Sequence, residues 1–306
     1  MLDVRRLRLL RELSERRTVT AVAHALSYTP SAVSQQLAAL ERDAGVQLLE
    51  RVGRGVQLTE AGHRLVVHAD AVLAQLEAAE ADLEQVSGRV TGSLRIATFQ
   101  TAAHALVLPA MRPLASRHPE LRTQVIQAEA EDALPALRLG DVDVVIAEEY
   151  DHAPRQRDPA LDYRDLCRDG LEFAVPETHH AARQASISFA DLAGDEWAGG
   201  ELGTAWHDML VRACRSIGGY EPDVRHHVDD VRLILSLVGA TDAVGLVPRM
   251  GWSGEEPGVV LLPLTEGPLN RRVFTAVRRG TGDRPAQRAV RDALAEQARA
   301  LGLQTA

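Results

Sequence analysis

Apolar residues of the N-terminal segment recur at helical spacing in three short stretches. A leucine stripe predicts a first helix that ends near Arg16, and a second helix is expected to reach Leu26. A turn over residues 27–30 then leads into a third helix that begins with Pro30. In this helix the apolar residues recur at i, i+4 and i+7: Val33, Leu37 and Leu40. The outward positions are then small and polar: Ser31, Ser34, Gln35 and Ala38, with Arg42 further along.

Two short helices, a tight turn and a third helix with a small, polar outer face are typical of a helix-turn-helix. Hydroxyl and amide side chains of this size allow a helix to enter the DNA major groove and to hydrogen-bond to base edges. After Gly45, two short apolar stretches flank Arg54, which stands between Gly53 and Gly55. This pattern predicts a wing in which Arg54 contacts a phosphate or the minor groove.

A long helix is predicted to follow, from Thr59 and Glu60 to about Val86. At ~1.5 Å per residue it would be roughly 40 Å long, which is unusual for a helix inside a globular core. Its apolar residues alternate at spacings of four and three: Leu65, Ala69, Val72, Leu76, Ala79, Leu83 and Val86. Such a heptad seam is typical of a two-stranded coiled coil, so we predict a homodimer through this helix. The alternative is a core helix packed on its own domain.

After a linker at residues 87–92, the pattern changes to alternating strands and helices, as in an α/β domain with a mostly parallel sheet. The expected strands are residues 94–98, 122–128, 142–147, 171–176, 196–199, 224–228, 243–248 and 271–278. The expected helices are residues 102–117, 131–139, 205–216, 230–239 and 285–300. Pro135 is compatible with its helix only in the first turn or at a bend.

Charge divides the chain into two parts. Residues 1–64 carry ten arginines and seven acidic residues, which gives this segment a net charge of +3. Since the whole chain has a net charge of −9, the remaining residues carry −12. A basic module on an acidic body favours contact with a polyanion, and the alternative is a solvated arginine-rich face. All 34 basic residues are arginine. The absence of lysine excludes Schiff-base chemistry, a pyridoxal phosphate anchor and the P-loop lysine.

The run TAVAHALSYTPSAVSQQLAALERDAGVQLLERVGRGVQLTEAGHRL, residues 20–65, resembles the winged helix-turn-helix of LysR-type transcriptional regulators. The resemblance continues through the long helix into a sensor domain and so covers essentially the whole chain. It implies a periplasmic-binding-protein-like effector domain, in which crossing strands join two α/β lobes around a small-molecule cleft. Where the family commonly has Ser-Gln-Pro, this chain has Thr29-Pro30-Ser31, so no base preference is carried over.

The expected fold is therefore α/β overall, with three parts. Residues 1–58 form the winged helix-turn-helix DNA-binding domain, residues 59–87 the dimerisation linker helix, and residues 92–306 the effector-binding domain. Lobe one is expected at about 92–165 and 266–306, and lobe two at about 166–265. The resemblance further implies a homotetramer and a double-stranded DNA operator with dyad symmetry.

The expected DNA contacts lie on the third helix and the wing. We expect Ser31, Ser34 and Gln35 to contact bases and Thr29 to contact a phosphate, beside the helix start at Pro30. Arg51 and Arg54 are expected to contact the DNA backbone or the minor groove.

The effector is expected at the carboxyl ends of strands, beside helix N-termini. In lobe one this rule selects Thr98, Phe99, Gln100, Thr101, Glu148 and Glu149. In lobe two it selects Glu201, Gly203, Thr204 and His227. Free backbone N–H groups near Thr101 and Thr204 would suit a carboxylate, whereas Glu148, Glu149 and Glu201 would suit a cation or a hydroxyl-rich ligand. The sequence leaves both open.

Other chemistry is not indicated. The pairs His179-His180 and His226-His227, the latter beside Asp229-Asp230, lack a spaced third ligand, so we expect no metal. Cys167 and Cys214 are expected to be small buried residues rather than a redox switch. No phosphate-binding loop, nucleophile elbow or zinc-protease motif is present, so we expect no catalytic residue and no cofactor.

These observations together predict a ligand-responsive, sequence-specific DNA-binding transcriptional regulator rather than an enzyme. No apolar run approaches the ~18–20 residues of a membrane helix, so we expect no membrane partner and a cytoplasmic protein. Two alternatives stay open: a two-lobed α/β enzyme whose N-terminal helices only oligomerise it, and a constitutive repressor with an empty cleft.

Overall fold

The computed structural model of the chain describes residues 1–303 apart from positions 54, 152, 253 and 255. Its N-terminal module contains α1 (Val4–Arg16), α2 (Val19–Ala25), α3 (Pro30–Ala44) and the antiparallel wing strands β1 (Leu49–Val52) and β2 (Gly55–Leu58). The side chains of Asp3, Thr18 and Thr29 cap the three helices. The apolar faces of these helices meet in one core, so the expected winged helix-turn-helix is confirmed.

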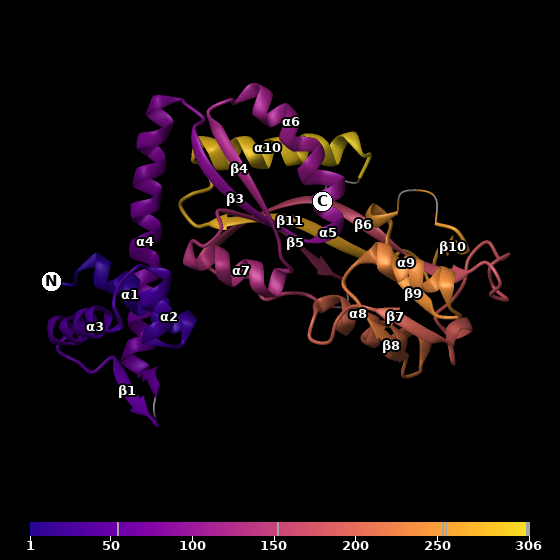
Figure 1. Ribbon diagram of the computed structural model, residues 1–306, viewed down its shortest axis with the longest axis horizontal. Coiled ribbons are helices and arrows are strands. Elements are labelled where there is room, and N and C mark those ends of the chain that lie inside the picture. The colour runs from indigo at the N-terminus through magenta and orange to yellow at the C-terminus, as the bar shows by residue number, and fades with distance from the viewer. Residues whose placement is uncertain (54, 152, 253, 255, 304–306) are drawn as a thin grey trace.

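The long helix α4 (Glu60–Ser87) connects the module to the rest of the chain (Figure 1). Thr59 caps its start, and Gly88 ends it in a left-handed conformation. Its first turns belong to the core of the module, where Val66 and Ala69 are buried. Farther along, the helix loses this cover, and the side chain of Leu83 is 73% exposed.

Lobe one is built on a parallel group of strands, β4 (Leu121–Gln127), β3 (Gly92–Thr98) and β5 (Val144–Tyr150), beside the antiparallel β11 (Asn270–Arg278). Four helical elements cover its two faces: α5 (Gln100–Ala102), α6 (Leu108–Arg117), α7 (Ala130–Leu139) and α10 (Pro285–Ala300). A π-helical turn over Ala103–Val107 joins α5 to α6, so residues 100–117 are continuously helical. Pro135 lies at the sixth position of α7, beyond its first turn.

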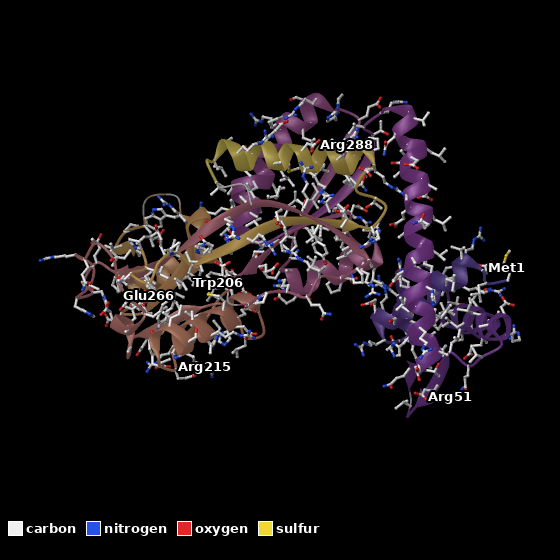
Figure 2. The ribbon with its side chains drawn as sticks, turned by 180° about the vertical axis from the view of Figure 1, so that it is seen from behind. Met1, Arg51, Trp206, Arg215, Glu266 and Arg288 are labelled. Atoms are coloured by element: carbon white, nitrogen blue, oxygen red, sulfur yellow. The ribbon has the colours of Figure 1, made fainter. Side chains whose placement is uncertain are left out.

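Lobe two shares the same sheet through β6 (Leu161–Pro176), which pairs with β11 along its first half and with β9 (Val244–Pro248) along its second. Beyond β9 lie β7 (Glu196–Gly199) and β8 (Asp223–His227), and β10 (Val259–Leu262) pairs with β6. The helices α8 (Ala205–Ala213) and α9 (Val231–Ala240) pack on these strands around Phe173, Phe189 and Trp197. Figure 2 shows Trp206, Arg215 and Glu266 in this lobe, at the end of the molecule opposite Met1 and Arg51.

The strand pattern extends beyond the sequence expectation in two places. Residues 161–170 form the first half of β6, whereas only residues 171–176 were expected as a strand. Charged residues interrupt this half, so it has no continuous apolar run. The strand β10 was not expected, because its four residues VVLL precede a proline without any periodic pattern.

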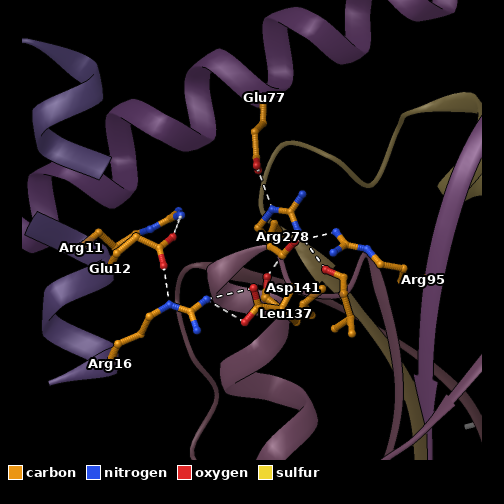
Figure 3. Close-up of polar contacts among 10 residues, drawn as sticks. Arg11, Glu12, Arg16, Glu77, Arg95, Leu137, Asp141 and Arg278 are labelled. Carbon is orange, nitrogen blue, oxygen red and sulfur yellow. Dashed lines mark hydrogen bonds and ion pairs between the residues drawn. The ribbon is translucent and has the colours of Figure 1, made fainter. Parts of the chain in front are cut away.

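The N-terminal module is docked on lobe one by ion pairs (Figure 3). Arg16 of α1 contacts Asp141, just after α7, at 2.7 Å. Arg138 near the end of α7 contacts Asp70 of α4 at 2.6 Å and Glu15 of α1 at 3.1 Å. Arg278 at the end of β11 donates to Glu77 of α4 at 2.8 Å, as Figure 3 shows. Charged side chains from four elements therefore join the two parts of the chain.

Candidate DNA-binding surface and effector cleft

The third helix presents a polar outer face while its apolar residues are buried. Ser31, Ser34 and Gln35 are exposed, and the opposite side of α3 is packed into the module core. Thr29 Oγ1 accepts a hydrogen bond from Ala32 N at 3.2 Å and lies 3.0 Å from Ser31 Oγ. The Ser34 hydroxyl donates to the carbonyl of Pro30 at 3.0 Å. The face is therefore held in one conformation and is open to solvent.

The wing lies beside this face. A groove of about 530 Å³ runs between α3 and the wing, and its lining includes Ser34, Ala38, Gln47 and Arg51. Figure 2 shows Arg51 at the tip of the module, away from the effector domain. Arg54, the other expected wing contact, lies outside the described residues.

Glu41 fixes the wing to α3, a role that sequence reasoning did not identify. Its Oε1 atom accepts hydrogen bonds from the backbone N–H groups of Leu48 and Leu49 at 2.9 and 3.0 Å. The Glu41 carboxylate on α3 therefore satisfies the two backbone N–H groups where the wing begins. Only its position, directly after the last apolar residue of the stripe and shortly before the wing, could have indicated this.

In the effector domain the structure brings several expected residues together at the carboxyl ends of β3 and β5. Thr98 and Phe99 are buried at the end of β3. The Thr101 hydroxyl accepts a hydrogen bond from Arg271 Nη2 at 2.7 Å. Gln100 Nε2 lies 3.5 Å from Asp230 Oδ1, which caps α9 of lobe two. Residues of the two lobes thus meet where the strand-end rule places a ligand.

A buried ion pair supports this region. Arg271 and Asp169 are 2% and 1% exposed, and Arg271 Nη2 lies 2.8 Å from Asp169 Oδ2. The other carboxylate oxygen of Asp169 accepts from Met250 N at 2.9 Å, and the Arg271 guanidinium lies 5.0 Å from the centre of the Phe99 ring. Sequence reasoning missed this pair, because its partners are 102 positions apart and only the antiparallel pairing of β11 with β6 joins them.

Four carboxylates gather beside Arg271: Glu129, Glu131, Glu148 and Asp229. Burial raises the pKa of Glu148 to about 7, against the opposing effect of Arg271 and Arg155. Burial is the largest cause and repulsion from Glu148 the second; together they raise the pKa of Glu129 to about 8. Burial also raises the pKa of Asp229. Glu129 and Glu131 were not among the expected residues, although they follow the end of β4 and the strand-end rule would have selected them.

The expected residues of lobe two form a loop around the start of α8. Thr204 caps this helix by accepting from His207 N at 3.3 Å, and Gly203 has a φ of +89°. Glu201 is exposed, and its backbone N–H donates to Asp229 Oδ1 at 2.8 Å. His227 is also exposed, with its ring centre 5.5 Å from that of His207.

The start of α8 already holds a carboxylate from lobe one. Glu131 Oε1 accepts from Ala205 N at 3.1 Å and from Arg155 Nη2 at 2.7 Å. This contact joins the two lobes and occupies the N–H group that the sequence offered to a ligand.

Glu149 lies on the other side of β5 from Glu148, since neighbouring residues of a strand point to opposite faces. Its carboxylate pairs with Arg157 at 2.7 Å and with Arg272 at 2.9 Å. Glu149 therefore does not belong to the carboxylate cluster at Glu148.

The two cysteines and the described histidines show no arrangement for redox or metal chemistry. Cys167 and Cys214 are buried in the cores of different lobes. Burial raises the pKa of Cys167 to about 12 and that of Cys214 to about 11, which keeps both as thiols at neutral pH. Within the described part of the chain, no group of three or more His, Cys, Asp or Glu residues could hold a metal ion.

Two family models match the chain in succession. The model described as a bacterial regulatory helix-turn-helix protein of the lysR family matches residues 4–63, and the LysR substrate binding domain matches residues 87–299. The chain belongs to the LysR family. It is a DNA-binding transcriptional regulator with a substrate-binding domain for small-molecule effectors. The matched families are transcription regulators, which are generally not enzymes.

Relatives and solved structures agree with this assignment over nearly the full length. The transcriptional regulator BudR of Raoultella terrigena is 25% identical over 290 residues, covering 94% of this chain and 98% of BudR. The dual regulator OxyR of Escherichia coli K12 is 27% identical, covering 92% and 90%. A full-length OxyR variant from Pseudomonas aeruginosa superposes with a TM-score of 0.68 at 19% identity, covering 98% and 95%. A structure of CbnR with its target DNA gives a TM-score of 0.55 at 22% identity, covering 97% and 100%.

No helix in the described ranges combines the length and the apolar character that crossing a membrane requires.

Proposed function

We propose that the chain acts in the cytoplasm as a ligand-responsive regulator that binds an operator with dyad symmetry through α3 and the wing. The observation that supports this most strongly is the exposed polar face of α3 beside Arg51, across one open groove. In this proposal residues 1–58 bind DNA, residues 59–87 dimerise, and residues 92–306 bind the effector. The lobes are close to the expected boundaries, except that Glu266 is assigned to lobe two, where its carboxylate accepts from Phe189 N. The chain has no catalytic role.

The residues of the DNA surface have different roles. Ser31, Ser34 and Gln35 contact base edges, because their side chains stand on the outer face of α3. Thr29 and Pro30 place the N-terminus of α3 against a phosphate, which the helix dipole favours. Arg51 and Arg54 contact the backbone or the minor groove.

Gln35→Ala tests the base-reading role. The variant should bind the operator with an altered base preference, because an amide that contacts a base edge discriminates by about 1–3 kcal/mol. The measurement is selection of bound duplexes from a randomised pool, for this variant and for the control Gln124→Ala, an exposed glutamine on β4 of lobe one. An equal loss of affinity on all duplexes, with no change in preference, would reject the role of Gln35.

The dimer forms through the outer side of α4. The seam residues Val72, Leu76, Leu83 and Val86 are 40%, 45%, 73% and 87% exposed. A second copy of α4 covers this seam at coiled-coil spacing, and two such dimers form the homotetramer.

The helix α7 couples the cleft to the DNA-binding module. Glu129 and Glu131 lie at its start, in the carboxylate cluster, and Arg138 near its end pairs with Glu15 and Asp70. The helix is about 15 Å long, so one rigid element spans both sites. A ligand that displaces the start of α7 therefore changes the docking of the module, which alters the placement of α3 within the dimer.

A further inference from the structure

Two acceptor side chains lie at the edge of lobe one that meets lobe two. The strands β3 and β5 are parallel, with Thr98 opposite Ile146. Glu148 lies two residues farther along β5, and Gln100 begins α5, two residues after Thr98. Gln100 points toward Asp230 of lobe two, and Asp229 acts on Glu148 as a neighbouring charge.

Both side chains have a buried oxygen atom that lacks a donor. Glu148 is 5% exposed, and its Oε2 atom has no hydrogen-bond partner among the described residues. The Oε1 atom of Gln100 is buried and unpartnered in the same way. The amide orientation of Gln100 is determined by its neighbour, since Nε2 faces the Asp230 carboxylate. Unpaired buried acceptors are costly, so this site favours a ligand that brings hydrogen-bond donors.

The charges around the site give the sign of that ligand. The acidic groups that face Glu148 are Glu129 and Glu131 of α7 and Asp229 before α9, and the phenol of Tyr150 lies nearby. The basic groups are Arg155 and Arg271, and both are engaged: Arg155 with Glu131, and Arg271 with Asp169 and Thr101. The start of α8 is occupied by Glu131. The helix start at Gln100, which has no side-chain cap, is the feature that favours an anion instead.

We propose that the cleft binds a small organic cation, with an ammonium or guanidinium group held by Glu148 and Gln100. This assignment rests on the proposed function, because it names the ligand class of the same cleft. An ammonium supplies three donors and a positive charge, which satisfies both orphan oxygens and offsets the carboxylates.

The pH dependence of binding separates a cation from an anion. Glu148 and Glu129 have a raised pKa, about 7 and about 8, so both are mostly protonated at pH 6 and bound protons compete with a cation there. A cation should therefore bind more tightly near pH 8.5 than near pH 6, and a carboxylate ligand should show the reverse.

The test uses the full chain and thermal melting, followed by calorimetry of each compound that raises the melting temperature. The probes are agmatine, putrescine and ethanolamine, with succinate and glutarate as anions, erythritol as a neutral compound and Mg²⁺ as a metal. At least one amine should bind, about tenfold more tightly at the higher pH, and Glu148→Gln should weaken it at least about tenfold. The matched control Glu177→Gln, an exposed site after β6, should leave affinity unchanged.

Several outcomes would overturn the assignment: binding of the carboxylates or Mg²⁺ alone, no binding by any amine, or amine binding that Glu148→Gln leaves intact. Fluorescence anisotropy with operator DNA on the same sample distinguishes failure of the ligand class from failure of the proposed function. Intact DNA binding without amine binding rejects only the ligand class, whereas loss of DNA binding by the unmodified chain rejects the proposed function.

Discussion

At the scale of single residues, burial decides which carboxylates of the cleft are ionised. Glu129 stands at the N-cap position of α7, but its side chain accepts no capping hydrogen bond from the helix. Burial raises the pKa of this carboxyl to about 8. Between the ordinary pKa of a glutamate and about 8, Glu129 is therefore protonated in the folded state and ionised in the unfolded state. Stability contributed by this group is present at low pH and is lost as pH rises through the window from about 5 to about 8.

Glu129→Gln should stabilise the unliganded chain at pH 8 and have little effect at pH 5. The neutral amide removes a charge that is buried beside Glu148 and Asp229, and the expected gain at pH 8 is about 1–3 kcal/mol. Urea unfolding at the two pH values measures the difference. A gain of the same size at both values would show that ionisation of Glu129 is not the cause.

The buried pair of Arg271 and Asp169 should be among the most sensitive positions of the chain. Arg271→Met leaves the Asp169 carboxylate buried with only Met250 N as a donor, which should cost about 3–5 kcal/mol. The double variant with Asp169→Leu should recover much of this loss, because no unpaired charge is left. Thermal melting against Arg288→Met, an exposed arginine of α10, provides the comparison. A single variant as stable as that control would contradict the account.

At the scale of elements, Gly280 permits α4 to dock on lobe one. Its φ is +90°, and a Cβ atom there would lie 2.3 Å from the carbonyl oxygen of Ala74 in α4. Gly280→Ala should therefore displace α4 and cost about 1–3 kcal/mol more than Gly267→Ala, which has a φ of +105° but no atom within 4 Å of the added Cβ. Thermal melting of the two variants isolates the clash from the backbone strain. Equal losses would mean that α4 does not pack on this loop in solution.

The coupling role of α7 has its own test. Arg138→Ala should loosen the module from lobe one, because Arg138 contacts Glu15, Asp70 and Asp158. Hydrogen exchange of α1 should become faster, while Arg117→Ala, which breaks an exposed pair with Glu296 in the same lobe, should leave α1 unchanged. If hydrogen exchange of α1 were unchanged in Arg138→Ala, the proposal that α7 couples the cleft to the DNA-binding module would be rejected.

The sequence predicted elements whose signal is local, and missed those whose stability comes from distant partners. Thr59 and the seam of α4 predicted its start and its length, and Pro285–Ala300 was expected with the observed bounds. The first half of β6 escaped detection, because charged residues such as Arg164 and Asp165 are paired there across the sheet or on a helix. The strand ends selected Gln100, Thr101 and Glu148, which the structure places at the edge where the lobes meet, but Glu149 on the other face of β5 could not be separated from Glu148 without the register.

At the scale of the whole molecule, the proposed polyanion-binding surface lies at one end and the cluster of carboxylates lies in the body, with α7 between them. The basic module carries +3 and the rest of the chain carries −12, so the positive charge is concentrated at the end proposed to bind DNA. Wing arginines on such a surface release counterions when they contact phosphates, which makes affinity fall with salt.

The most direct test is fluorescence anisotropy of the full chain on the duplex upstream of its own gene and on a scrambled duplex, at about 50 and about 200 mM salt. The account predicts preferential binding to the first duplex that weakens with salt. It also predicts that Arg51→Ala reduces the salt slope by about one and Arg288→Ala does not. Absence of salt-dependent binding to either duplex would contradict the assignment of α3 and the wing to DNA.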